Sequence, residues 1–140
     1  MRIIAPSSLL RSSLHADAAA SGLIGLLQSM AAGWLSELTN VPHGLVLGSG
    51  LFLLAYTGLV AFVARHATTE WRHIAGIIVT NMAWAVAGMS LLALGVIAPT
   101  GIGLLYVLLQ IVTFFSFAGV ELTGLRASRD AVVDDAVARA

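Results

Sequence analysis

The chain has 140 residues, of which 59% are apolar and only 10% are charged, and its mean hydropathy is +0.95. Ordinary soluble domains carry about 25% charged residues, so too few polar side chains are present here to cover a water-facing surface. The seven basic and seven acidic residues cancel, which leaves no basic face for nucleic acid. The absence of cysteine excludes disulfides and thiol chemistry. These values argue against a soluble enzyme and predict a small integral membrane protein.

Residues 1–16 are expected to form a short cytoplasmic or interfacial segment with its own helix. Arg2 and Arg11 would meet lipid headgroups while the apolar side chains contact the membrane. Those apolar residues are Ile3, Ile4, Leu9, Leu10 and Leu14. The alternative is a signal peptide cleaved near residues 30–33, but the apolar stretch is too long for one and contains Gln28.

Four apolar stretches, at about residues 18–38, 44–64, 74–96 and 101–122, are long enough to cross a bilayer. A helix needs about 20 residues to span roughly 30 Å of hydrocarbon. The runs are continuous rather than alternating, which favours helices over a membrane barrel. Because the separators are short, successive helices should lie antiparallel. The predicted fold class is all-α, a membrane-spanning antiparallel four-helix bundle over residues 17–125.

The positions of the arginines predict the orientation of this bundle. Arg2 and Arg11 precede the first span, and three arginines follow the fourth. Arg65 and Arg72 lie around the second loop, whereas the first and third loops contain no arginine. The positive-inside rule therefore places both termini and the middle loop in the cytoplasm. Residues 126–140 are expected to form a polar cytoplasmic tail with a short helix that has one apolar face.

The large aromatic residues have two expected positions. Trp34, Trp71 and Tyr106 lie toward the ends of spans, where interfacial aromatics are usually found. Trp84 lies in the middle of the third span and is expected to pack between helices. Small residues at four-residue spacing, Ala18 with Gly22 and Gly44 with Gly48, would let helices approach closely.

The few polar side chains inside the spans fall on shared helix faces. Asp17, Ser21 and Gln28 form one stripe on the first span, and Gln110 and Glu121 share the polar face of the fourth. In each span the acid and the amide are eleven residues apart, and the two spans run in opposite directions. The acids should therefore lie at one depth, and the amides at another, about 16 Å farther from the cytoplasm.

Asn81 of the third span should lie at the same depth as Tyr56 of the second, so both residues join the polar side chains inside the spans. The predicted intramembrane polar cluster contains Asp17, Ser21, Gln28, Tyr56, Asn81, Gln110 and Glu121. The amides have two interpretations, which are hydrogen bonds between helices, worth about 0.6 to 2 kcal/mol each, or a ligand site.

The two acids also have two interpretations. The first is a salt-bridged collar with arginines near the same cytoplasmic boundary, which are Arg11, Arg65, Arg72 and Arg126. The second is a proton or cation site, because two neighbouring carboxylates cannot both ionise cheaply. Measuring transport in Asp17→Asn and Glu121→Gln variants would separate the two.

Catalytic chemistry lacks the residue patterns that it needs. The four histidines lie outside the spans or at their ends, with His43 on the opposite side from His15, His66 and His73, so no bis-histidine haem site is expected. There is no nucleophile with a base and an acid, no metal-ligand spacing and no phosphate-binding loop. The sequence therefore predicts no enzyme activity, no metal site and no cofactor.

Four short segments carry a family resemblance: Asp-Ala-Ala-Ala-Ser-Gly at 17–22, Gly-Leu-Phe-Leu-Leu-Ala-Tyr at 50–56, Asn-Met-Ala-Trp at 81–84 and Ala-Pro-Thr-Gly at 98–101. Over about residues 14–126 the chain resembles a family of small uncharacterised bacterial membrane proteins with four transmembrane helices. The resemblance implies that fold and a place in the bacterial inner membrane, and it implies no activity.

Two other families are similar in outline only. Small multidrug exporters also have four spans and an acid in the first, which would be Asp17, but here the acid lies at the membrane edge and the arginine bias is stronger than theirs. Fluoride channels share an intramembrane asparagine and a Thr/Phe/Ser/Phe stretch, as at Asn81 and 113–117. Here these elements come one helix too late, and the early Gly-rich, Arg-containing segment of that family is missing.

The expected function is that of an accessory or scaffolding subunit without catalytic activity. It would contact lipid and pack against a larger membrane complex or against itself through its small-residue faces. The alternative is a small transporter or channel that uses the level of Asp17 and Glu121. That alternative implies a homo-oligomer, since four helices alone enclose little room for a water-filled path.

Overall fold

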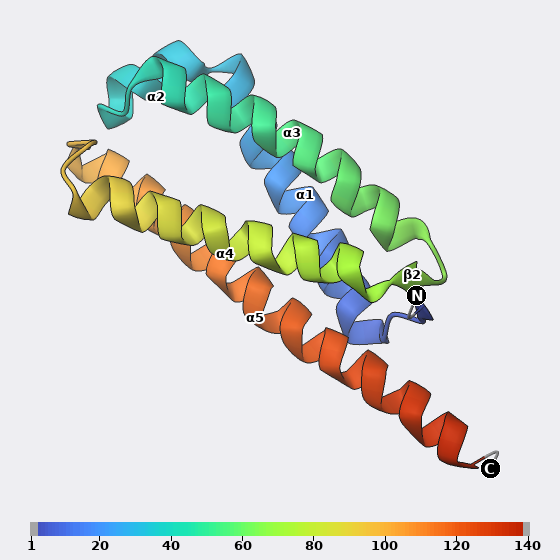
Figure 1. Cartoon of the computed structure of the whole chain (residues 1–140). Helices are drawn as coiled ribbons and strands as arrows, with labels where there is room; N and C mark the ends of the chain where they lie inside the picture. The colour runs from blue at the N-terminus through green and yellow to red at the C-terminus, as the bar shows by residue number, and fades with distance from the viewer. Residues whose placement is uncertain (1–2, 139–140) are drawn as a thin grey trace.

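The computed structural model describes the backbone of residues 3–138 and the side chains of residues 3–128. Within these residues the chain forms five helices and one two-stranded sheet (Figure 1). The helices are α1 (Ser8–Met30), α2 (Ala32–Thr39), α3 (His43–Arg65), α4 (Trp71–Ala93) and α5 (Gly101–Ala138), and the strands are β1 (Ile3–Ile4) and β2 (Thr69–Glu70).

Three of these helices are long and apolar enough to cross a membrane. They are α3, α4 and the part of α5 from Gly101 to Ser128, and the bent pair of α1 and α2 is a fourth candidate if it is one span. Apart from the short strand pair, the described chain is all-α, with three to four candidate spans that pack as a bundle. The predicted all-α, multi-span fold class is confirmed at this level.

The first predicted span differs from the helix that the structure shows. Instead of one helix over 18–38, α1 runs from Ser8 to Met30, and α2 turns away from it by 91° after Ala31. The turn lets α2 bury Ala32 and Leu35 in an apolar cluster with residues of α3 and α5. A sharp bend therefore ends the first helix eight residues before the expected end of the span.

The expected interfacial helix at the N-terminus is also replaced by a different arrangement. β1 precedes α1, and Ile4, Leu10 and Leu14 are buried in the core of the bundle instead of facing lipid. Leu10 packs directly on α5, because a Cβ added at Gly124 would lie 2.9 Å from Leu10 Cβ. The expected headgroup contact of Arg2 and the apolar face of the tail helix lie outside the described side chains.

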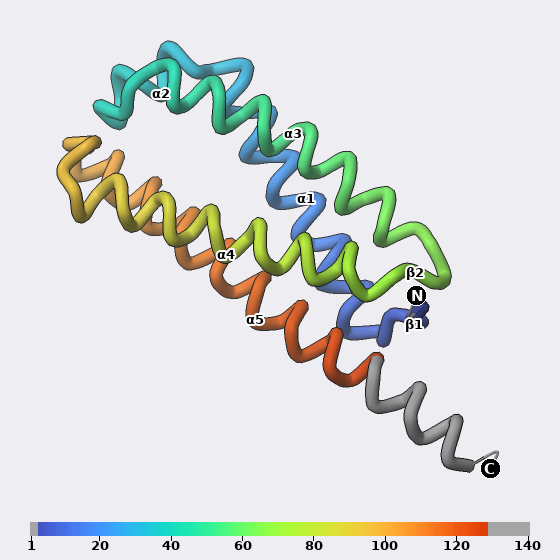
Figure 2. The backbone as a smooth tube through the Cα atoms, viewed as in Figure 1, coloured from blue at the N-terminus to red at the C-terminus, as the bar shows by residue number. Residues whose placement is uncertain are grey.

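The bundle is an open arc of helices rather than a closed ring. α3 packs along α1, α1 packs against α5, and α4 packs along α5, whereas the backbones of α3 and α4 come close at few points and the two helices meet mainly through side chains. Figures 1 and 2 show α3 and α4 close together near β2 and diverging toward α2. The first and last helices are neighbours, as the polar stripes required, but the arc leaves one end of the α3–α4 boundary open.

The helices α1 and α3 approach each other closely at Gly50. A Cβ at this position would lie 2.7 Å from Gln28 Cβ and 2.7 Å from Ser29 Oγ, so only glycine fits without movement of α1. Gly44 and Gly48, whose spacing suggested close approach, have no atom within 4 Å of an added Cβ. These two glycines therefore border open space in the described structure.

Hydrogen bonds join the α2–α3 turn to the α4–α5 loop. Thr100 N donates to the Thr39 carbonyl oxygen over 3.0 Å, and Asn40 Nδ2 donates to the Ala98 carbonyl oxygen over 2.7 Å. Asn40 has a positive φ of 56°, a left-handed conformation that asparagine tolerates at the end of a helix. The first and third loops therefore lie at the same end of the bundle.

The other end holds the N-terminus and the α3–α4 connection. β1 and β2 pair antiparallel, with Ile3 opposite Glu70. Ser7 N donates to Ser128 Oγ of α5 over 2.9 Å. The start of the described chain, the second loop and residue 128 thus lie together, at the end opposite the first and third loops.

Candidate functional site

Four helices contribute polar side chains to one buried network, here named the carboxyl cluster. Its members are Asp17 and Ser21 of α1, Tyr56 of α3, Asn81 of α4 and Glu121 of α5, and all five are buried. Each of these side chains lies on the inward face of its helix. The network lies where α3 and α4 are close enough for side chains of both helices to reach Asp17.

The Asn81 amide links the two carboxyls. Its Nδ2 donates to Asp17 Oδ2 over 2.9 Å and to Glu121 Oε2 over 3.2 Å. The Tyr56 hydroxyl lies 2.8 Å from Asp17 Oδ2 and 2.9 Å from Asn81 Oδ1, and its single proton can serve only one of these acceptors at a time. Ser21 Oγ donates to Asp17 Oδ1 over 2.8 Å. One amide group therefore holds two acids from opposite ends of the chain.

The carboxyl cluster has fewer hydrogen-bond donors than acceptor atoms. Glu121 Oε1 is buried and has no hydrogen-bond partner among the described residues. A buried acceptor without a donor costs about 1 to 3 kcal/mol, and more when the group is charged. A proton on this carboxyl, or a cation bound beside it, would supply the missing partner.

Neither carboxyl is paired with an arginine in the part of the chain that the structure describes. The partners of Asp17 include a serine, a tyrosine and an asparagine, and Glu121 contacts the same asparagine and Asp17 itself. The arginines expected in a salt-bridged collar are exposed, namely Arg11, Arg65, Arg72 and Arg126. The described contacts thus contain no such collar.

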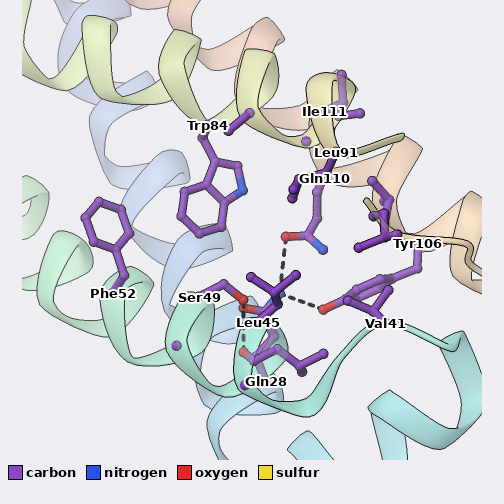
Figure 3. A pocket seen from close by; sticks show the side chains of 17 residues that line it. Gln28, Val41, Leu45, Ser49, Phe52, Trp84, Leu91, Tyr106, Gln110 and Ile111 are labelled. Carbon is purple, nitrogen blue, oxygen red and sulfur yellow. Dashed lines mark hydrogen bonds between the residues drawn. The ribbon is translucent and has the colours of Figure 1, made fainter. Parts of the chain in front are cut away.

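A second polar group, here named the amide cluster, lies nearer to the C-terminal end of α1 than the carboxyl cluster does, and Figure 3 shows its side chains. Gln28 Nε2 of α1 donates to the Tyr106 hydroxyl over 2.6 Å and to Gln110 Oε1 over 3.2 Å, both on α5. Ser49 Oγ of α3 lies 2.9 Å from Gln28 Oε1 and can donate to it. The cluster carries no charge, and α4 contributes none of its four side chains.

The structure divides the predicted polar residues between these two groups. The carboxyl cluster contains five of them, and the amide cluster contains the other two, Gln28 and Gln110. Sequence reasoning missed Ser49. It placed Tyr106 toward the end of the fourth span, on the same helix face as Gln110, and there the structure shows it bonded to Gln28.

A cavity of about 380 Å³ lies between α3 and α4 beside the amide cluster. The amide-cluster side chains form its polar wall, as Figure 3 shows. The rest of the lining is apolar or glycine, and its larger side chains are Val41, Leu45, Val46, Phe52, Trp84, Leu91, Ile97, Val107 and Ile111. No charged side chain lines the cavity in the described part of the chain.

An aromatic layer stands between the cavity and the carboxyl cluster. Phe52 of α3 stacks on Trp84 of α4, with ring centroids 5.4 Å apart and planes 9° apart. Phe52 also stacks on Tyr56, and Trp84 meets the edge of Phe114. Trp84 packs between helices as expected, and its contact with Phe52 bridges the α3–α4 boundary at the inner end of the cavity.

The histidines lie apart from both clusters. All four are exposed, and Nδ1 of His15 and of His66 each lies 2.7 Å from a backbone carbonyl oxygen of its own helix. Among the described residues, no three His, Asp or Glu side chains are close enough together to hold a metal ion.

No protein-family model, no curated protein and no solved structure matches this chain. The small bacterial family that the sequence resembles therefore has no match to support it. The structure does support the broader class, a small membrane protein with three to four long apolar helices.

Proposed function

We propose that this small membrane protein is an oligomeric transporter or channel that binds a proton or a small cation at the carboxyl cluster. The observation that carries the proposal is the pair of fully buried carboxyls, Asp17 and Glu121, on the single amide of Asn81. Two like charges in a low-dielectric interior repel each other unless a positive charge joins them. Ionisable side chains inside membranes commonly mark ion pathways.

The sequence favoured an accessory subunit over a transporter or channel. The absence of an arginine partner for either acid among the described residues reverses this preference. A salt-bridged collar would have explained the acids as structural. Without it, the unpartnered Glu121 Oε1 favours a bound proton or cation. In this role the chain has no catalytic activity, and a homo-oligomer provides the aqueous path that one bundle lacks.

Infrared spectroscopy of the protein in lipid vesicles tests proton binding directly. We expect a pH-dependent carbonyl band from a protonated carboxyl in the wild type, and its loss in Glu121→Gln or Asp17→Asn. Glu37→Gln is the matched control, because Glu37 is exposed on α2, far from the cluster in sequence. An unchanged band in both cluster variants would overturn the proposal.

Proton flux in the same vesicles tests transport. With a trapped pH dye, potassium inside the vesicles and a potassium ionophore to carry the compensating charge outward, the wild type should acidify the vesicles at least tenfold faster than empty vesicles. Both cluster variants should approach the rate of empty vesicles, while Glu37→Gln keeps the wild-type rate. The same assay with a sodium gradient distinguishes proton from sodium movement. A wild type that matches empty vesicles in both assays would contradict transport.

A second candidate, the accessory subunit, is favoured by one face of α4. Small residues recur there at helical spacing and are largely exposed, which suits close packing of another transmembrane helix. They are Gly76, Thr80, Ala83, Ala87 and Ser90. Purification in native lipid separates the two functions. An accessory subunit would co-purify stoichiometrically with a larger membrane partner and show no flux alone, whereas a transporter would purify as an active homo-oligomer.

We also propose that the bundle is antiparallel in a bacterial inner membrane, with both termini in the cytoplasm. The described arginines lie on segments at the end that holds β1, β2 and residue 128, which the positive-inside rule assigns to the cytoplasm. The chain has no native cysteine, so single-cysteine variants label without background. In intact cells an impermeant reagent should label His43→Cys and not Thr68→Cys, and the reverse pattern would invert the orientation.

A further inference from the structure

We propose that the cavity between α3 and α4 binds a neutral, membrane-soluble amphiphile whose polar end carries a carbonyl-type hydrogen-bond acceptor. Lipid-soluble quinones and acylglycerols share this chemistry. The proposal goes beyond the proton or cation site, because it concerns the amide cluster on the other side of the Phe52–Trp84 layer. It follows from the polar wall, the lack of charge and the position of the opening.

The polar wall presents donors to the cavity. The Tyr106 hydroxyl accepts a hydrogen bond from Gln28 Nε2 over 2.6 Å and also interacts with the Gln110 side chain, so it lies among the polar groups of the cavity wall. A hydroxyl that already accepts a hydrogen bond is a stronger donor. The indole nitrogen of Trp84 has no acceptor among the described residues, and Figure 3 shows it on the side of the ring that faces Gln110. Both groups suit a ligand oxygen.

Gln28 anchors this wall, since it is a polar side chain only 2% exposed. Gln28 Oε1 accepts a hydrogen bond from Ser49, and Gln28 Nε2 donates to Tyr106 and Gln110. These hydrogen bonds order the polar wall without a ligand. Preorganised polar groups in an otherwise apolar pocket are typical of small-molecule sites, whose volumes run from about 300 to 1,000 Å³. The cavity volume of about 380 Å³ falls in this range.

The lining also limits the charge of the ligand. A charged headgroup would lose its water and find no opposite charge among the described lining residues. A neutral carbonyl or hydroxyl oxygen can be satisfied by the available donors. Phospholipid headgroups are therefore excluded, and neutral amphiphiles are favoured.

The opening of the cavity leads between two membrane helices. Gly44 and Gly48 of α3 line it and carry no side chain, and Ala87 of α4 lies exposed at its lining. Because the backbones of α3 and α4 diverge toward α2 and both helices are candidate spans, an opening between them faces hydrocarbon. An apolar tail can leave through it while the polar end reaches Tyr106, so the ligand enters sideways from the bilayer.

Filling the opening tests the proposal without disturbing the packed helices. In Gly48→Leu the added side chain starts in open space and extends into the entrance, because no atom lies within 4 Å of its Cβ. Gly58→Leu is the matched control: it is the same substitution on the same helix, it also meets open space, and it is not among the lining residues. Circular dichroism and thermal melting verify that both variants fold.

Binding is measured with the full chain in phosphatidylcholine nanodiscs and two probes, a short-tailed benzoquinone and dioctanoylglycerol. We expect at least one probe to bind, with affinity at least tenfold weaker in Gly48→Leu and within twofold of wild type in Gly58→Leu. Tyr106→Phe should weaken binding about fivefold, which corresponds to one lost hydrogen bond. The probe that binds identifies the source, and binding of either supports the proposal.

Three results would overturn it. These are no binding of either probe, equal binding by Gly48→Leu and wild type, or equal competition by an anionic phospholipid. Photocrosslinking from residue 48 in native membranes adds a fourth, since capture of another polypeptide would mean that a protein helix occupies the opening. Because the binding assay does not depend on protons, its failure leaves the infrared and flux tests of the carboxyl cluster independent.

Discussion

The two polar clusters use similar hydrogen bonds for opposite arrangements. The carboxyl cluster takes a side chain from each of α1, α3, α4 and α5, whereas the amide cluster takes none from α4. Where α4 supplies Asn81, the four helices join around two acids. Farther along α4, Trp84 and Gly88 line a cavity that lies between α3 and α4.

The difference shows that the distance between α3 and α4 determines whether buried polar side chains bond only to the protein or can also reach a ligand. In the carboxyl cluster nearly every polar atom has a partner from the protein, and the exception is Glu121 Oε1. In the amide cluster the polar side chains form a wall that a ligand can reach. Charge follows the same division, because acids lie where four helices meet and neutral amides lie where the bundle is open.

The largest effect is expected from Asn81→Leu, which removes the amide that holds both carboxyls. Leucine has as many side-chain non-hydrogen atoms as asparagine but leaves Asp17 and Glu121 without a shared donor, so the free energy of unfolding should fall by about 2 to 4 kcal/mol. Reversible unfolding in mixed detergent micelles measures this. Thr80→Val is the neighbouring control, because Thr80 bonds only to the Gly76 carbonyl of its own helix. An equal loss in both variants would remove the special role of Asn81.

Gly50→Ala tests the close contact that holds α1 against α3 between the clusters. The new Cβ would lie 2.7 Å from Gln28 Cβ and 2.8 Å from Ser29 N, and such overpacking costs about 1 to 3 kcal/mol.

Gly58→Ala is the matched control for this contact. Its Cβ meets no atom within 4 Å, so the higher helix propensity of alanine should make that variant up to about 1 kcal/mol more stable. Opposite signs in the same unfolding assay are therefore expected, and two stabilised variants would contradict the contact.

Gln28→Leu should have the smallest effect of the three. It removes the centre of the amide cluster, but the lost partners are neutral, so the expected cost is about 0.6 to 2 kcal/mol. Ser29→Ala should be nearly neutral, since Ser29 Oγ is buried and has no hydrogen-bond partner among the described residues. A loss for Gln28→Leu as large as that for Asn81→Leu would erase the distinction between the charged and the neutral cluster.

The general fold could be predicted because continuous apolar runs leave helices as the means of crossing a membrane. The relation of Asp17 to Glu121 was also accessible, since matched eleven-residue spacings on antiparallel helices bring two acids to one depth. The hydrogen bonds by which Asn81 links the two acids could not be predicted from the sequence, because they depend on how α4 is rotated about its axis. The cavity depends on the divergence of α3 and α4, which tertiary packing determines and helical periodicity does not encode.

The bend after α1 was hidden for a similar reason. Met30, Ala31 and Ala32 at the bend are all apolar and compatible with a helix, so their composition does not separate a continuous span from a turn. The choice is made by the apolar face of α2, which buries Leu35 with residues of the open end. Local propensity is weak at such a position, and packing overrides it.

The bend also changes the electrical position of the carboxyl cluster. With α1 running from Ser8 to Met30, Asp17 lies nine residues from one end of the helix and thirteen from the other, which corresponds to about 14 Å and 20 Å. A cation that enters from the nearer end therefore crosses roughly 0.4 of the helix length. At 100 mV this fraction of the field amounts to about 0.9 kcal/mol per elementary charge. Occupancy of the carboxyl cluster should accordingly follow the membrane potential, changing about fivefold over 100 mV.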